Sequence, residues 1–198
     1  MKILLIGASG TLGQAATGAL GAHELITAGR NSGQHRVDLA RPGSVAALLA
    51  EVGRVDAIVC TAGNVHFGPL TEMTAEQFNL GLQDKLLGQV QLATLGHRHL
   101  NDGGSITLTS GVLATDPIRF GASATAVNGA IEAFVAAAAI ELPRGIRINA
   151  VSPTLLTESL PTYGPYFQGF ETVPAARVAL AYQRSVEGAQ TGRVLRVL

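Results

Sequence analysis

The stretch that decides the fold reads Met1-Lys2-Ile3-Leu4-Leu5-Ile6-Gly7-Ala8-Ser9-Gly10-Thr11-Leu12-Gly13. Its apolar run Lys2–Ile6 predicts a buried strand, and the segment Leu12–Leu20 predicts a helix. The glycines between them supply a tight turn, a close backbone approach and intimate packing of the helix on the sheet. The N-terminus of such a helix presents unpaired amides and a positive dipole end to an anion. We therefore expect a pyrophosphate site with contacts from Gly7, Ser9, Gly10, Thr11, Leu12 and Gly13.

Short apolar runs alternate with helical segments along the rest of the chain. The predicted strands are Lys2–Ile6, Leu25–Ala28, Ala57–Cys60, Ser105–Thr109, Arg147–Val151 and Val194–Val197, with a weaker one at His35–Val37. The predicted helices are Leu12–Leu20, Ser44–Val52, Thr74–Gly81, Asp84–Leu100, Ala122–Leu142 and Pro174–Glu187. This alternation indicates right-handed crossovers and hence an α/β fold class. We expect a Rossmann-type doubly wound parallel sheet in three α/β/α layers, as a single domain over residues 1–198.

Two irregular stretches interrupt this pattern. Asn101-Asp102-Gly103-Gly104 has the composition of a turn. Residues 152–171 are rich in proline, tyrosine and glycine and form the longest irregular segment. Loops of that length are usually functional lids or disordered, so we interpret this one as a flap on the substrate side.

The composition argues against a polymer or membrane partner. Lys plus Arg and Asp plus Glu both number 14, so no net field favours nucleic acid or an anionic membrane. The single cysteine, Cys60, lies in an apolar run and is better explained as a buried reduced thiol than as a reactive one. We find no apolar stretch of membrane-spanning length and no signal-peptide core, so we expect a soluble, cytoplasmic protein.

The end of the second predicted strand bears on the choice of nucleotide. An NAD-binding protein usually places a carboxylate there for the ribose hydroxyls, but the chain has Arg30, Asn31 and Ser32 instead. A guanidinium suits a 2′-phosphate, which favours NADP(H), with a solvated loop arginine as the alternative. After the weak strand, Asp38 can accept from the adenine amino group and Leu39 can pack on its ring.

Several ordered segments resemble the short-chain dehydrogenase/reductase family over nearly the whole chain. The loop Gly7–Gly13 spaces its glycines like the family's less common GxxGxxG branch, and Thr61-Ala62-Gly63 resembles the family's Asn-Ala-Gly. Ser105–Gly111 resembles the fifth strand with its serine, and Arg147–Thr154 is similar to the family's "RVNAVSPG" segment. The resemblance implies cofactor contacts from Thr61, Ala62, Gly63, Pro153, Thr154 and Leu156.

The catalytic set that the resemblance implies is altered. Aligning residues 126–134 with the family's "ASKAALEAF" puts Ala124 at the tyrosine and Asn128 at the lysine. Aligning Asp84–Gly88 with the family's "VNLKG" puts Lys85 at the asparagine, so lysine and asparagine exchange places. In the family fold these positions face one pocket. Lys85 is then a proton donor or a binding group, unless it is an exposed residue of an amphipathic helix, and Ser110 remains a hydroxyl for a substrate carbonyl.

Other candidates carry less weight. His97 and His99 point to different faces of a helix, so we expect no metal. His66 could approach the pocket as a replacement acid, and Tyr163 or Tyr166 could swing inward, although a loop residue or a pocket cover is the more ordinary reading.

The leading hypothesis is an atypical reductase that transfers hydride between NADPH and a small carbonyl compound, using Ser110, Lys85 and Asn128. The alternatives are a catalytically retired NADP(H)-binding sensor or partner-binding protein, and an isomerase or lyase that uses the nucleotide structurally. The resemblance also implies a homodimer or homotetramer built on the helix Ala122–Leu142 and the one before it.

Overall fold

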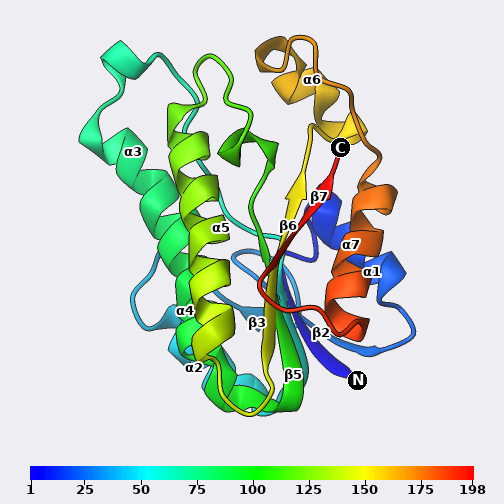
Figure 1. The fold of residues 1–198 in the computed structure, drawn as a ribbon. Helices are drawn as coiled ribbons and strands as arrows, with labels where there is room; N and C mark the ends of the chain where they lie inside the picture. The colour runs from blue at the N-terminus through cyan, green and yellow to red at the C-terminus, as the bar shows by residue number, and fades with distance from the viewer.

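Seven parallel strands form one sheet in the order β3-β2-β1-β4-β5-β6-β7 in the computed structural model, which describes residues 1–198. The strands are β1 (Lys2–Ile6), β2 (Glu24–Gly29), β3 (His35–Arg36), β4 (Val55–Cys60), β5 (Leu100–Thr109), β6 (Arg147–Pro153) and β7 (Arg193–Val197). The order reverses between β1 and β4, and ligands of open α/β sheets bind beyond the carboxyl ends of the strands at such a switch point. That end of the sheet lies at the top of Figure 1.

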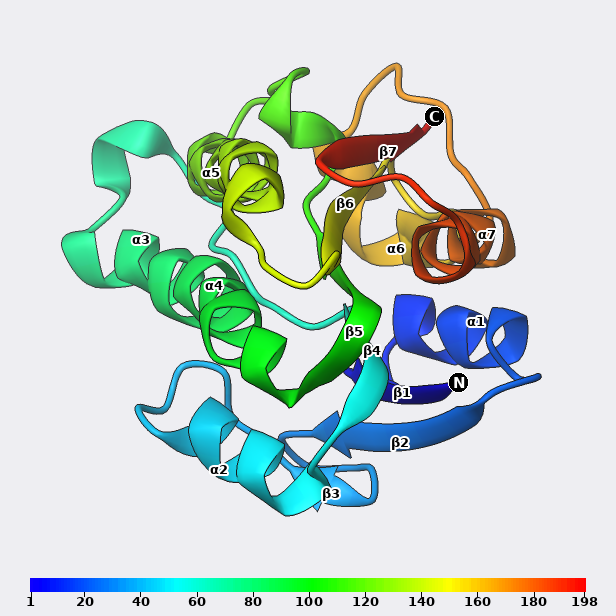
Figure 2. The same cartoon turned by 60° about the horizontal axis from the view of Figure 1, so that its bottom comes forward.

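Helices cover both faces of the sheet, as the view in Figure 2 shows. One face carries α1 (Thr11–Ala19) and α7 (Ala175–Glu187), and the other carries α2 (Ser44–Val52), α4 (Gly88–Thr94) and α5 (Ala122–Glu141). Side chains along β1 point alternately to the two faces of the sheet, so β1 contributes to both hydrophobic cores. Leu4 and Ile6 belong to one core cluster, whereas Ile3 and Leu5 belong to the other. The expected three-layer Rossmann-type fold is confirmed.

The long helix expected over Asp84–Leu100 is interrupted in the structure. Following α3 (Ala75–Gly81), residues Leu82–Leu87 form a π-helical turn, and Gly96–His99 form a 3-10 turn after α4. The Asn101–Gly104 segment lies within β5 rather than in a separate turn. The register between β4 and β5 shifts there, and Gly103 absorbs the bulge with a φ of 74°.

The segment 152–171, interpreted above as a flap, contains only short helical turns of three or four residues after the end of β6. These are Thr157–Ser159, α6 (Leu160–Tyr163) and Gly164–Tyr166. The segment lies over the carboxyl ends of the strands, beside the C-terminus (Figure 1).

Helix α5 departs from the expectation that no segment has the length of a membrane span. An 18-residue window of this helix has a mean hydropathy of 1.4, and 33% of the window is buried. By length and composition alone, the helix could therefore cross a membrane. In the structure it packs on β6 and contributes Val127, Ile131 and Val135 to the core. A single helix packed in this way is weak evidence for a span.

The contact between α1 and the end of β1 generates a prediction about stability. A Cβ at Gly13 would lie 2.0 Å from the Gly7 carbonyl oxygen, whereas at Gly18 of the same helix it would meet nothing within 4 Å. We expect Gly13→Ala to lower the free energy of unfolding by about 1–3 kcal/mol. The matched control Gly18→Ala should raise it by up to about 1 kcal/mol, because alanine is the better helix former. Urea denaturation measures both, and a Gly13→Ala protein as stable as the wild type would contradict the close contact.

Candidate functional site

The loop between β1 and α1 has the geometry that a pyrophosphate requires. Gly7 adopts a φ of 88°, and its amide donates to the Ala28 carbonyl at 2.8 Å. The Gly10 amide turns back to the Gly7 carbonyl at 3.0 Å, and no side chain caps α1. The amides of the first turn of α1 are therefore left for an anion.

Side-chain hydroxyls hold this loop against its neighbours. The Thr61 Oγ1 hydroxyl lies 3.0 Å from the Ile6 carbonyl and 3.1 Å from the Gly7 carbonyl, so it ties the end of β4 to the loop. The Ser32 hydroxyl donates to Ser9 Oγ at 2.7 Å across from the second strand. These contacts hold the loop between the ends of β2 and β4.

Arg30, which directly follows β2, forms ion pairs with two carboxylates. Its Nη2 donates to Asp38 at 3.2 Å and to Asp84 at 3.1 Å, while its side chain stays 52% exposed. Asp84 is buried. Its carboxylate also accepts hydrogen bonds from the backbone N–H of Asn64 at 3.0 Å and from the side-chain Nδ2 of Asn64 at 2.5 Å. The guanidinium is thus held in place with part of its donor set directed to solvent, beside exposed Asn31.

Asp38 and Leu39 differ in accessibility. The Asp38 carboxylate also accepts from the Ala40 amide at 3.1 Å and is partly exposed. Leu39 is 4% exposed and packs against Gly88 at the start of α4, where a Cβ would lie 2.6 Å from Leu39 Cβ. Leu39 therefore offers little side-chain surface for an adenine ring in this conformation.

A cavity of about 230 Å³ brings together seven of the predicted site residues, but not Ala62. The predicted site residues on its wall are Gly63, Lys85, Ser110, Asn128, Pro153, Thr154 and Leu156. Its apolar wall is formed by Val65, Phe67, Val112, Leu113, Leu155 and Phe167, and Ser159 and Tyr163 reach it from the flap segment. The pocket therefore has one polar end and one apolar, partly aromatic end.

Lys85 faces this pocket from the π-helical turn. Its Nζ donates to the Ser110 carbonyl at 3.2 Å, and burial lowers the pKa of the amine to about 8. Gly63 makes room for it, because a Cβ there would lie 2.7 Å from Lys85 Cγ. An ammonium group whose pKa lies near neutrality can exchange a proton with a bound oxygen.

Ser110 belongs to a polar chain that sequence reasoning missed. Its hydroxyl donates to Glu132 Oε1 at 2.9 Å, and Glu132 Oε2 accepts from Arg196 Nη2 at 2.9 Å. Glu132 lies four residues after Asn128 on α5, so helical spacing alone puts both on one face. That spacing is a signal the sequence contained, but the pairing with Arg196 of β7 depends on the tertiary fold.

Asn128 and Ala124 occupy the positions where the resemblance implies a lysine and a tyrosine. Asn128 is 4% exposed, and its Oδ1 is buried without a hydrogen-bond partner. Ala124 is also buried and lines the pocket. Tyr163 is the tyrosine that reaches the pocket wall, with its ring 5.6 Å from that of Phe67.

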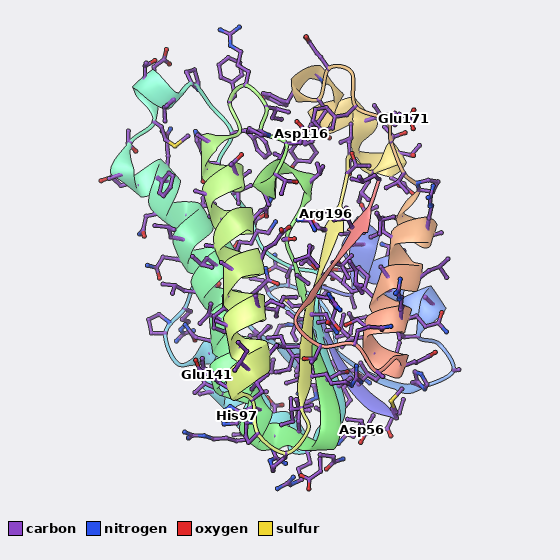
Figure 3. All side chains as sticks on the ribbon, viewed as in Figure 1. Asp56, His97, Asp116, Glu141, Glu171 and Arg196 are labelled. Carbon is purple, nitrogen blue, oxygen red and sulfur yellow. The ribbon has the colours of Figure 1, made fainter.

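The other candidates do not line the pocket. His66 and Tyr166 are not among the lining residues, and Tyr166 instead packs on Phe67 with ring centroids 5.6 Å apart. Figure 3 shows His97 near the bottom of the molecule, well below Arg196, and His97 Nδ1 lies 3.3 Å from the Ala93 carbonyl. Cys60 is buried, and desolvation raises the pKa of its thiol to about 12.

Solved structures match this architecture over the full chain. A crystal structure of the protein lin1944 from Listeria innocua is 53% identical, with a TM-score of 0.98 and complete coverage of both chains. A small-chain dehydrogenase in complex with NADPH is 28% identical, with a TM-score of 0.87, and the match covers 100% of this chain and 96% of that one.

Curated relatives and a family model agree with these structures. An uncharacterized oxidoreductase of Mycobacterium tuberculosis is 30% identical over 90% of this chain and 77% of its own length. Versicolorin reductase 1 of Aspergillus parasiticus is 34% identical over 60% of this chain and 47% of its own length. An uncharacterized oxidoreductase of Methylorubrum extorquens is matched over 50% of its length, so the chain spans about half the length of these last two relatives.

The family model described as enoyl-(acyl carrier protein) reductase matches residues 14–194. This range includes β2 to β6, the first two residues of β7 and every helix after α1. It also includes all the residues that line the pocket. The chain therefore belongs to the short-chain dehydrogenase/reductase family of oxidoreductases.

Proposed function

We propose that this protein transfers hydride between NADP(H) and a small carbonyl or alcohol substrate. The observation that carries the proposal is the single pocket in which Gly63, Pro153 and Thr154 meet Lys85 and Ser110. The first three stand where the family contacts the cofactor, and the last two are polar groups able to hold a reacting oxygen.

The phosphate loop and the residues near Arg30 would hold the nucleotide. The uncapped amides at the start of α1 suit the pyrophosphate, and Arg30 with Asn31 and Ser32 suits a 2′-phosphate. Asp38, Thr61 and Ala62 lie along the same edge of the sheet. The NADPH bound to the 28% identical small-chain dehydrogenase supports the choice of this nucleotide.

When bound, the reduced nicotinamide would supply a hydride to the carbonyl carbon of the substrate. Lys85, as an ammonium, donates a proton to the carbonyl oxygen, and the pKa of about 8 makes that transfer feasible near neutral pH. Ser110 orients the substrate oxygen. Its hydroxyl can turn from Glu132 toward a carbonyl, or keep that bond and accept from an alcohol.

The segment 152–171 would cover the substrate, because Ser159, Tyr163 and Phe167 contribute to the pocket wall. We further propose a cytoplasmic homodimer or homotetramer. Helix α5 supports it with an apolar outer face, exposed in the monomer, of Ala126, Ala133, Ala136, Ala137 and Ile140.

NADPH consumption with a panel of small aldehydes and ketones tests the reaction. We expect wild-type turnover that declines as pH rises through about 8, because Lys85 loses the proton it must donate above its pKa. Lys85→Ala should lower kcat by at least about 100-fold and abolish that decline. A purified protein that binds NADPH but oxidises none would instead be a sensor, and product formed without net NADPH oxidation would indicate an isomerase or lyase.

Nucleotide choice is tested separately by equilibrium titration. Arg30→Ala should raise the Kd for NADPH by about 10- to 100-fold, because it removes a charge-assisted bond to the 2′-phosphate. The Kd for NADH, which lacks that phosphate, should change by less than about threefold. Arg36→Ala, an exposed arginine on β3, serves as the matched control. Equal losses for both nucleotides would refute the assignment of Arg30.

A further inference from the structure

Asp84 places a carboxylate at a buried position where the aligned family segment is apolar. Its side chain is 8% exposed, and in the alignment with the family's "VNLKG" it takes the place of the valine. A buried ion pair is often no more stabilising than the apolar side chains that could replace it, because both charges lose their hydration. The stability of the fold alone therefore does not account for a carboxylate at this position.

The two oxygens of Asp84 are held by different partners. Oδ2 accepts from the backbone N–H of Asn64 at 3.0 Å and from Asn64 Nδ2 at 2.5 Å, whereas Oδ1 accepts from Arg30 Nη2 at 3.1 Å. Asn64 directly follows Gly63, in the loop after β4 where the family contacts the cofactor. The carboxylate is therefore fixed to this loop, and it in turn fixes Arg30.

Arg30 keeps much of its hydrogen-bonding capacity in this arrangement. A guanidinium carries N–H donors on three nitrogens, and both ion pairs of Arg30 use Nη2. Nη1 and Nε make no hydrogen bond within the protein, and the side chain is 52% exposed. A free arginine side chain on a surface samples many rotamers, and it gives up that freedom when it binds an anion. Asp84 removes this freedom in advance and leaves two nitrogens available.

Asp38 pairs with the same nitrogen but is the weaker of the two anchors. Its side chain is 38% exposed, and ion pairs at exposed sites are worth little. Asp84 instead lies on the π-helical turn Leu82–Leu87, and such turns are rare and frequently found at functional sites. The next residue of that turn, Lys85, lines the substrate pocket. One turn thus supplies a side chain to Arg30 and another to the pocket.

We propose that Asp84 is a specificity-determining residue, which positions the Arg30 guanidinium for the 2′-phosphate of NADP(H). The inference rests on the proposed function. Asp84 acts through Arg30 and not on the nucleotide itself, so it is a positioning residue. Its contribution is therefore confined to a nucleotide that carries the 2′-phosphate, and NADH gains nothing from a fixed guanidinium.

Equilibrium titration of a double-mutant cycle tests this role without any turnover. The amide of Asp84→Asn brings an N–H donor against either Arg30 or Asn64, which are donors themselves, and it removes the charge that attracts the guanidinium. The Kd for NADPH should rise by about 10-fold, since the rotamer freedom of an arginine is worth at most about 30-fold, and the Kd for NADH by less than about twofold. In an Arg30→Ala background, Asp84→Asn should change either Kd by less than about twofold, because the residue through which it acts is gone.

Asp102→Asn is the matched control, because Asp102 forms an ion pair with Arg144 at the amino end of β5. It should change neither Kd. Equal losses for NADPH and NADH, or a loss that persists in the Arg30→Ala background, would mean that Asp84 only supports the fold. Tighter NADPH binding by Asp84→Asn would mean that its charge opposes the phosphate. Each of these results overturns the proposal.

Should Asp84→Asn fail to fold, Asn64→Ala provides the second measurement, because it removes a bond that holds Asp84 but keeps the ion pair. The Kd for NADPH should then rise by about threefold relative to that for NADH, and an unchanged ratio overturns the proposal. An Arg30→Ala protein that binds NADPH like the wild type would overturn the nucleotide assignment of the proposed function, and the role of Asp84 with it. A wild-type protein that prefers NADPH but oxidises none would overturn the proposed reaction alone.

Discussion

The close approach of the Gly13 backbone to the Gly7 carbonyl is the constraint on which the rest of the structure depends. Because no side chain separates α1 from the end of β1, the helix starts directly at the edge where β1 and β4 diverge. Its unpaired amides then face the same crevice as Thr61 and Gly63, which follow β4. Any side chain at Gly13 would push the helix away and move the anion site from the pocket.

The π-helical turn at Leu82–Leu87 carries two neighbouring charged residues, Asp84 and Lys85, whose side chains point to different parts of the site. Asp84 turns toward Arg30, whereas Lys85 turns toward the Ser110 carbonyl. Asn64 donates to Asp84 and also lines the substrate pocket. The anchor of Arg30 and the polar end of the pocket are therefore connected through one buried carboxylate, so a substitution at Asp84 should perturb both.

Those features of the fold that depend on local sequence patterns could be predicted from the sequence. The predicted bounds of six strands lie within two residues of the observed ones, and glycine spacing located the turn before α1. The start of β5 was predicted at Ser105, five residues after its observed start at Leu100. The bulge at Asn101–Gly104 was missed, because it depends on the register with β4. The Glu132–Arg196 pair was missed since its partners are 64 residues apart, and the two bonds of Arg30 to Asp38 and Asp84 needed the same tertiary knowledge.

The exchange of lysine and asparagine that the resemblance implies concerns two residues of the pocket wall, Lys85 and Asn128. A buried acceptor without a partner costs about 1–3 kcal/mol, and Asn128 Oδ1 is such an acceptor on the pocket wall. An ammonium at this position would instead have demanded an acceptor. Lys85, another residue of the pocket wall, carries the amine instead. The polar end of the pocket thus combines the amine of Lys85 with the amide of Asn128.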